Sequence, residues 1–209
     1  MNFLAHALLS GGDGDILLGN LMADFLRPGT PIPDREGVKR GIAWHYQIDR
    51  FMDSHPLVAR GRARLFPHYR HYSAVLIDLF YDHLLATSWN HWSQTPLEAF
   101  AAQTYGQLTQ RLDDMPERMR EVIPAMIEGD WLRAYAREDG IRYALTRIQR
   151  RASKGEGLGK AWGDFAASRS LYEAEFNEFM PQILALRDVQ FSTEGTKKNG
   201  ETQNEQRGI

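Results

Sequence analysis

The chain has 209 residues, of which 43% are hydrophobic and 25% are charged, and its formal net charge is −2 at pH 7. This is the composition of a globular protein, and the nearly neutral total argues against a dedicated nucleic-acid binder. The absence of cysteine excludes disulfides, thiolate zinc sites and cysteine nucleophiles. Any metal must therefore bind to His, Asp, Glu or backbone oxygen.

Apolar residues recur at three- and four-residue spacing through most of the chain, which is the pattern of amphipathic helices. The sequence predicts an all-α fold, a compact helical array in a single domain spanning residues 1–191. The expected helices are at residues 2–10, 15–26, 35–54, 57–66, 70–91, 95–112, 117–137, 140–151 and 160–187.

The expected breaks follow from proline, glycine and polar segments. Residues 27–33 hold three of the nine prolines and should form an extended loop, and Gly155–Gly159 should form a second break. The segment 192–209 has no aliphatic or aromatic side chain before its last residue, so we expect a disordered tail. No segment approaches the roughly 18 apolar residues that cross a bilayer, and the start of the chain lacks a basic leader, so we expect a cytoplasmic protein with no membrane partner.

Aspartate is concentrated in the first part of the chain. Up to Asn90 the sequence has eight aspartates but only one glutamate, Glu36, and six of the seven histidines lie in the same part. Glutamate is the better helix former, so aspartate inside helices suggests that a short, stiff carboxylate is required. Capping explains Asp13 and Asp34 but not the mid-helix residues Asp49, Asp53, Asp78 and Asp82.

Helical spacing places these acids beside histidines. His45 and Asp49 are four residues apart and lie on one helix face, next to an apolar stripe. Asp82 and His83 occupy a similar margin on a second helix, and Asp24 and His6 extend the same combination of residues. Partly buried carboxylates pair with cations or bind metal, so a metal site is one interpretation.

Each pair also has a simpler interpretation. His45 with Asp49 alone can be an ordinary helical ion pair, and Asp82 can serve only to orient His83. His6 alone can be a core histidine with its hydrogen bonds satisfied. The sequence has no di-iron Glu-x-x-His motif, His-Glu-x-x-His motif, phosphate loop, dinucleotide fingerprint or Gly-x-Ser-x-Gly motif.

Several segments occur in a recognisable order along the chain: Met1–His6, Gly19–Phe25, Gly41–Asp49 and Asp78–Trp89. They resemble the acyl-carrier-protein phosphodiesterase (holo-ACP hydrolase) family, with a weaker similarity at Trp131–Tyr135. The family is all-helical and resembles divergent HD-type metal phosphohydrolases, usually assisted by manganese. The resemblance implies removal of the 4′-phosphopantetheine arm from holo-acyl carrier protein.

The resemblance also assigns residues and a cofactor. We expect a divalent metal, with manganese favoured over magnesium or iron, bound by residues from the set Asp24, His45, Asp49, Asp82 and His83. Asp24 should also orient the attacking water, and His6 is the candidate general acid. This chain has Tyr46 where the family pattern has Arg, so another arginine should contact the phosphate.

The implied partner is acyl carrier protein, a small acidic protein, so we expect a basic docking surface. The candidate residues are Arg27, Arg50, Arg60, Arg64 and Arg70, and a second basic run at Arg147, Arg150, Arg151 and Lys154 is an alternative. Two rival functions remain: a metal phosphohydrolase acting on a small nucleotide or other phosphodiester, and a helical binding module whose acids form only structural pairs. The sequence does not indicate the oligomeric state.

Overall fold

The computed structural model describes residues 2–152 and 157–201, and all secondary structure in these residues is helical, which confirms the all-α prediction. The α-helices are α1 (Phe3–Leu9), α2 (Gly14–Met22), α3 (Glu36–Ser54), α4 (Pro56–Tyr69), α5 (Tyr72–Thr87), α6 (Leu97–Thr109), α7 (Glu117–Glu128), α8 (Trp131–Ala134), α9 (Glu138–Arg151), α10 (Ala161–Ala167) and α11 (Arg169–Glu201). Short 3-10 helices are η1 (Ala23–Phe25), η2 (Trp89–His91), η3 (Leu112–Asp114) and η4 (Leu158–Lys160).

Two expected helices are each divided in the structure. The helix expected at 117–137 is interrupted by Gly129 and Asp130, because Asp130 adopts a left-handed conformation (φ 45°) that an α-helix cannot continue. The helix expected at 160–187 becomes α10 and α11, which meet at Ser168. The loop expected at 27–33 joins η1 to α3, and part of the break expected at Gly155–Gly159 lies outside the described residues.

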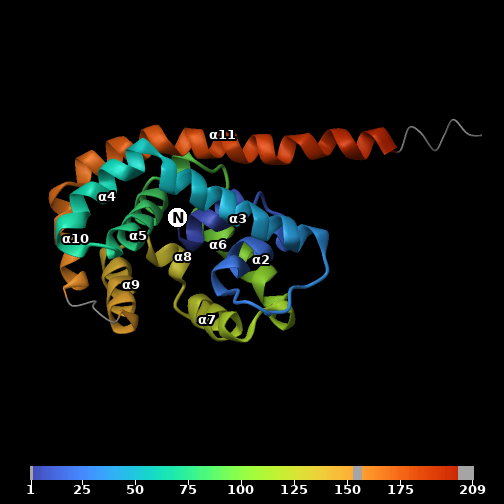
Figure 1. Ribbon diagram of the computed structural model, residues 1–209, viewed down its shortest axis with the longest axis horizontal. Helices are drawn as coiled ribbons and strands as arrows, with labels where there is room; N and C mark the ends of the chain where they lie inside the picture. Colours follow the sequence, from blue (N-terminus) through green and yellow to red (C-terminus); the bar gives the residue numbers. More distant parts are fainter. Residues whose placement is uncertain (1, 153–156, 202–209) are drawn as a thin grey trace, which may run out of the picture.

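The last helix is longer than expected. α11 packs along α4 and α5 and then continues past the body of the protein to Glu201 (Figure 1). It therefore enters the segment 192–209 for which we predict disorder, and residues 202–209 lie outside the described residues. The domain boundary at residue 191 stays a prediction. Among the described residues, no helix combines the length and the apolar character required of a membrane span.

α5 lies at the centre of the molecule and is buried on almost every side. Leu76, Leu79, Phe80, Leu84 and Leu85 are all at most 2% exposed. The rings of Phe165, Tyr172 and Phe176 from the C-terminal helices pack against this helix. A second group of buried apolar residues, including Leu18, Met22, Val38 and Met119, lies under α2, α3 and α7. Because Phe3 packs against both groups, α1 lies between the two halves of the core.

The backbones of α2 and α3 touch at two glycines. A Cβ on Gly19 would lie 2.0 Å from the Val38 carbonyl oxygen, and one on Gly41 would lie 2.2 Å from the Ile16 carbonyl oxygen. No larger residue fits at either position without separating the helices. This contact fixes the position of α3 relative to the end of α2, where Asp24 follows in η1.

Candidate metal centre

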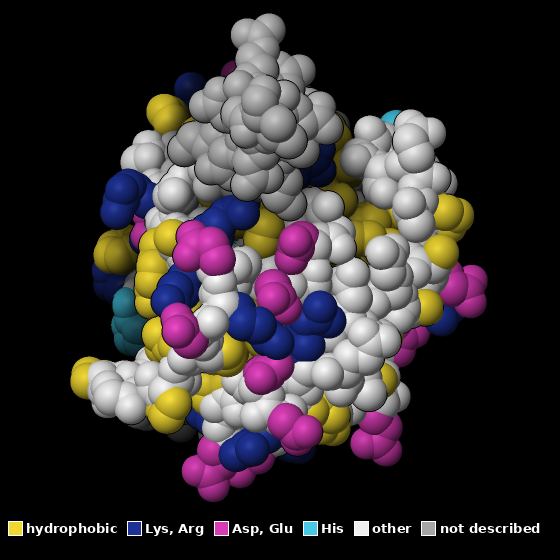
Figure 2. Space-filling model, turned by 90° about the vertical axis from the view of Figure 1, so that its right-hand side faces the viewer, with side chains coloured by type: hydrophobic (Ala, Val, Ile, Leu, Met, Phe, Trp, Pro, Cys, Tyr) yellow, Lys and Arg dark blue, Asp and Glu magenta, His cyan; other side chains and the backbone are white. Residues whose placement is uncertain are grey.

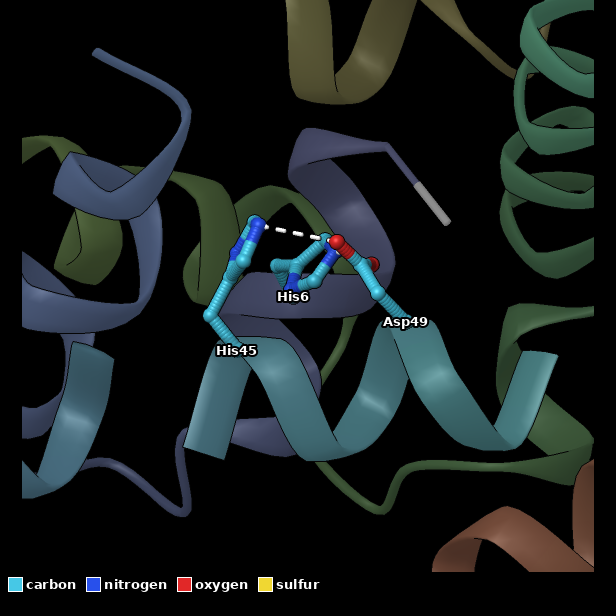
Figure 3. A group of neighbouring side chains, drawn as sticks. All are labelled: His6, His45 and Asp49. Atoms are coloured by element: carbon cyan, nitrogen blue, oxygen red, sulfur yellow. Dashed lines mark ion pairs between the residues drawn. The ribbon is translucent and has the colours of Figure 1, made fainter. Parts of the chain in front are cut away.

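Three side chains from α1 and α3 converge on one point. Nε2 of His6 lies 3.4 Å from Oδ1 of Asp49, and Nε2 of His45 lies 3.0 Å from Oδ2 of the same carboxylate. The two imidazole rings are stacked, with centroids 4.4 Å apart. One potential ligand atom from each residue lies within 4.8 Å of the other two. Figure 3 shows His45 and Asp49 rising from one face of α3 with His6 between them. We call these three residues with Asp24 the His/Asp cluster.

Asp24 completes the cluster from η1. Its Oδ1 lies 3.4 Å from Nε2 of His45, and its side chain is 60% exposed, whereas both histidines are buried. The packing of α2 against α3 at Gly19 and Gly41 brings this carboxylate to His45. Asp24 is therefore the member of the cluster that solvent reaches most easily.

The tautomer of His6 follows from a buried hydrogen-bond network. Its Nδ1 lies 2.7 Å from Oδ1 of Asn20, while Nδ2 of Asn20 donates to the His6 carbonyl oxygen and to Oγ of Ser10. Since Oδ1 can only accept, Nδ1 of His6 carries the proton. Nε2 then presents its lone pair to Asp49, which cannot donate to it when ionised. This nitrogen is buried and has no hydrogen-bond partner.

Two carboxylates determine the charge of His45. Burial disfavours the imidazolium, but Asp24 and Asp49 outweigh burial and raise the pKa of His45 to about 9. In return, His45 lowers the pKa of both carboxyls against the opposing effect of burial. Burial lowers the pKa of His6, so this second ring is neutral at pH 7. Without a metal, the cluster holds one imidazolium between two carboxylates.

These donors fit a divalent cation. Two imidazole nitrogens and one or two carboxylate oxygens form a set typical of manganese, iron or zinc, and the chain has no thiolate that would restrict the choice. The unpartnered Nε2 of His6 is a further indication, because a buried nitrogen without a partner is costly unless a ligand satisfies it. A cation would replace the proton on His45, since both occupy the position between the same carboxylates.

Asp82 and His83, two of the expected ligands, are not brought into this cluster. Asp82 is completely buried, and its carboxylate accepts hydrogen bonds from the backbone N–H groups of Asn2, Leu4 and Ala5 at 2.8 to 3.3 Å. These are the orphan donors at the start of α1, so Asp82 anchors the helix that carries His6. Burial raises the pKa of Asp82 to about 7, while the three N–H groups act in the opposite direction.

His83 is buried among aromatic rings. Its Nδ1 donates to the Tyr135 carbonyl oxygen at 2.8 Å, and its ring packs edge-on against Trp162 and Phe165. These contacts join α5 to the segment after α8. Asp82 and His83 therefore lie outside the group of possible ligands that the structure brings together, because the start of α1 and the Tyr135 carbonyl engage their polar atoms instead.

The five candidate docking arginines have different surroundings. Arg64 forms a bidentate ion pair with Glu175, in which Nη1 lies 3.0 Å from Oε1. Its guanidinium carbon lies 4.4 Å from the centroid of the Tyr172 ring. This arginine therefore ties α4 to α11. The other four are exposed: Arg27, Arg50, Arg60 and Arg70. Arg27 follows Asp24 closely in the chain, and Arg50 follows Asp49 directly.

The charges on one face of the molecule are mixed. On the side that lies at the right of Figure 1, acidic and basic side chains alternate among the coloured residues (Figure 2). Ion pairs elsewhere in the fold also combine both signs: Arg35, just before α3, pairs with Asp114 at 2.8 Å, and Arg111, just before η3, pairs with Asp15 at 3.0 Å. This face therefore offers no patch of a single sign among the residues drawn in colour.

A cavity of about 400 Å³ opens at the cluster. Asp24 and Asp49 line it, together with Asp53, Asp78, Asn2 and Val75. The exposed carboxylate of Asp24 therefore lies at the wall of this cavity. An all-α scaffold that holds buried histidines and carboxylates at the wall of a cavity is an arrangement typical of metal-assisted hydrolases.

Comparison with known proteins identifies the family. The family model described as acyl carrier protein phosphodiesterase matches residues 1–183, so the chain belongs to this family. A protein named acyl carrier protein phosphodiesterase from Pectobacterium atrosepticum is 31% identical over 194 residues, covering 91% of this chain and 99% of its own length. Proteins of the same name from Salmonella dublin and Photorhabdus laumondii are 32% and 31% identical and cover 88% of this chain and 96% and 93% of their own lengths. No solved structure matches the chain.

Asn20 and Asn2 are the contributors that sequence reasoning missed. Asn20 orients His6, and Asn2 caps α1 by accepting from the Phe3 N–H at 2.9 Å. The sequence could have indicated Asn20, because it is the only strongly polar residue in the apolar run Leu17–Ala23. An amide buried in such a run must find hydrogen-bond partners inside the protein.

Proposed function

We propose that this protein hydrolyses the phosphodiester bond that joins 4′-phosphopantetheine to holo-acyl carrier protein, releasing the apo-carrier. The observation that carries the proposal is the convergence of His6, His45 and Asp49 in a chain that matches the family model over residues 1–183. The names of the relatives, which cover nearly the whole chain, support the same substrate.

The proposed cofactor is a divalent cation, with manganese favoured over magnesium or iron. His6 and His45 would bind it through Nε2, and Asp49 through its carboxylate, with Asp24 at the exposed side. When bound, such a cation neutralises charge on the phosphate oxygens and lowers the pKa of water.

The exposed carboxylate of Asp24 is suited to orient the attacking water and to accept its proton. It lies at the cavity, and it is ionised at neutral pH because His45 lowers its pKa against the opposing effect of burial, so both of its oxygens can accept hydrogen bonds from water. The water oxygen bonds to phosphorus while its proton goes to Asp24, and the bond from phosphorus to the carrier's serine oxygen breaks. The serine oxygen takes up a proton from solvent, and Asp24 returns its proton to solvent. The products are the apo-carrier and 4′-phosphopantetheine.

For His6 the geometry favours the role of a ligand over that of a general acid. An acid needs a proton to give at the reacting side, but the proton of His6 is on Nδ1 and is held by Asn20. Burial also lowers the pKa of His6, which disfavours a second proton on Nε2. The proposal therefore moves His6 into the ligand set.

The proposed partner is an acidic carrier protein that docks next to the cluster. Arg27 and Arg50 are exposed and adjoin Asp24 and Asp49 in the sequence, so we propose them as the first contacts, with Arg60 and Arg70 on α4 as further candidates. Arg64 is engaged by Glu175 and fits docking less well. Arg147, Arg150 and Arg151 on α9 remain an alternative surface.

The test compares two substrates under the same conditions with manganese. We expect kcat/KM for the holo-carrier to exceed that for bis(4-nitrophenyl) phosphate, a small diester that has neither carrier nor arm. Faster turnover of the small diester would instead favour a general phosphodiesterase. No turnover of either substrate, with no loss of thermal stability in chelator, would favour a binding module.

A further inference from the structure

A second, larger cavity adjoins the cluster. Its volume is about 590 Å³, and it is bounded by the start of α1, by α5 and by α8 and α9. The start of the chain and α8 lie near the middle of the body, and α5 and α9 lie on the side away from the projecting end of α11 (Figure 1). Asn2, Asp24 and Val75 line both this cavity and the smaller one at the cluster, so the two spaces meet at these residues.

The walls of the larger cavity are mainly apolar and aromatic. Phe3, Trp131, Tyr143 and Ile148 line it, and Arg147 lies flat against Trp131 with its guanidinium carbon 3.6 Å from the ring centroid. Val75 and Tyr143 are exposed to 42% and 58%, which is high for large hydrophobic residues at the wall of a cavity. The larger cavity therefore differs chemically from the smaller one, in which four of the eight lining residues are aspartates.

The position of the cavity matches the covalent structure of the substrate. The scissile phosphate joins the serine of the carrier on one side to the pantetheine arm on the other. With the phosphate at the His/Asp cluster, the carrier must remain outside, and the arm must continue away from it. With the phosphate in this position, the arm would start near Asn2 and Asp24, and these residues also line the larger cavity.

We propose that the larger cavity, which we call the arm cavity, binds the pantetheine arm; this inference rests on the proposed function. The arm is uncharged, with a geminal dimethyl group, two amides and a terminal thiol. Apolar walls with a few hydrogen-bond donors suit such a group, and a volume of about 590 Å³ lies within the usual range for a small-molecule site. Arg147 offers both a flat face and donors for the amide oxygens.

Val75 is the specificity-determining position in this proposal. It lies on α5 at the junction of the two cavities, and the phosphate end of the arm must pass it. Because Val75 is 42% exposed and is not part of the buried core, Val75→Trp should narrow the junction and leave the core in place. Leu171→Trp is the matched control, because Leu171 is 54% exposed on α11 and lines neither cavity.

The first measurement is binding of free D-pantetheine to the full-length protein in chelator, by saturation-transfer NMR. This readout needs neither metal nor turnover. We expect binding to the wild-type protein and to Leu171→Trp, and a loss of at least about fivefold in Val75→Trp and in Tyr143→Ala. Absence of binding to the wild-type protein, or equal binding to all variants, would overturn the proposal.

The second measurement is kcat/KM for the holo-carrier with manganese, together with the thermal midpoint of each variant. We expect a decrease of at least about tenfold in Val75→Trp with unchanged manganese affinity and thermal midpoint. Equal kcat/KM in Val75→Trp and wild type would refute the arm cavity while the function stands. Failure of the wild type to act on the holo-carrier would refute the function, and the pantetheine measurement would still decide whether the cavity binds the arm.

Discussion

Asn20 fixes the orientation of His6. Its Oδ1 accepts the Nδ1 proton at 2.7 Å, and its Nδ2 donates to the His6 carbonyl oxygen at 3.0 Å, so one amide holds both the ring and the backbone of that residue. Residues that hold the second nitrogen of a metal-binding histidine set its tautomer and its basicity. The role proposed for His6 therefore depends on a residue that does not touch the metal position.

Asn20→Leu tests this dependence. We expect manganese affinity, measured by titration calorimetry, to fall by about 10- to 100-fold, because Nδ1 loses its acceptor and the ring can turn. Ser10→Ala is the matched control in the same network. It removes one of the two donors to the His6 carbonyl oxygen and one acceptor of the Asn20 amide, but it leaves the bond to Nδ1 in place, so its effect should be smaller. Wild-type affinity in Asn20→Leu would contradict the argument.

Asp24→Asn separates catalysis from folding. We expect turnover of the holo-carrier to fall by at least about 100-fold, because the amide cannot accept a proton from water. The helical circular dichroism signal should not change, because the side chain is 60% exposed. Asp53→Asn is the control: Asp53 lines the same cavity but pairs with Arg62, and we expect nearly full activity. Retained activity in Asp24→Asn would remove this residue from the mechanism.

The pKa of His45 predicts how stability varies with pH when no metal is bound. Asp24 and Asp49 raise the folded-state pKa to about 9, against 6.5 in the unfolded chain. The imidazolium therefore stabilises the fold fully below pH 6.5, and this contribution is lost as the pH rises through 9. In chelator, the thermal midpoint should fall between pH 6.5 and 9 in the wild type and fall less in His45→Gln.

His68→Gln serves as the control for the pH profile, because His68 is exposed on α4 and should leave the wild-type slope intact. Manganese binding should show the opposite trend, since the cation needs the neutral ring and displaces its proton. Affinity should therefore rise with pH over the same interval. Identical profiles for wild type and His45→Gln would contradict the assigned charge of the cluster.

Asp82→Ala distinguishes an anchor of α1 from a ligand. We expect the free energy of unfolding to fall by about 2 kcal/mol or more, because three backbone N–H groups lose their acceptor. At saturating manganese the variant should still bind metal with the wild-type stoichiometry, whereas His45→Ala should not. Loss of metal with unchanged stability in Asp82→Ala would restore Asp82 to the ligand set.

Arg27→Glu and Arg50→Glu test the proposed docking contacts. We expect each to raise KM for the holo-carrier, with little change in kcat, and to weaken the dependence of KM on salt, because charges at an interface rim chiefly steer the encounter. Arg118→Glu, an exposed position on α7, is the control for net charge. If KM changes equally in all three variants, docking does not depend on these two arginines.

The sequence alone predicts the part of the cluster whose geometry follows from helical spacing. His45 and Asp49 are four residues apart on one long helix, so their common face follows from local geometry, and the structure confirms it. Asp24 and His6 were selected by residue type and by family resemblance. Their actual positions depend on how α1 and η1 pack on α3, which no spacing rule provides.

Asp82 and His83 show why contacts between distant segments could not be predicted from the sequence. Their spacing suggests a polar margin on α5, but that helix is buried on nearly all sides. The start of α1 and the carbonyl of Tyr135 use their polar atoms instead. These partners are 77 to 80 and 52 residues away in the chain, so only the tertiary packing identifies them.

The most direct test of the central claim is the mass of holo-acyl carrier protein after incubation with the wild-type protein, in manganese and in chelator. We predict loss of the 4′-phosphopantetheine mass in manganese and none in chelator, with Asp24→Asn inactive under both conditions. An unchanged carrier mass in manganese, for a protein shown to be folded and to have bound the metal, would contradict the account.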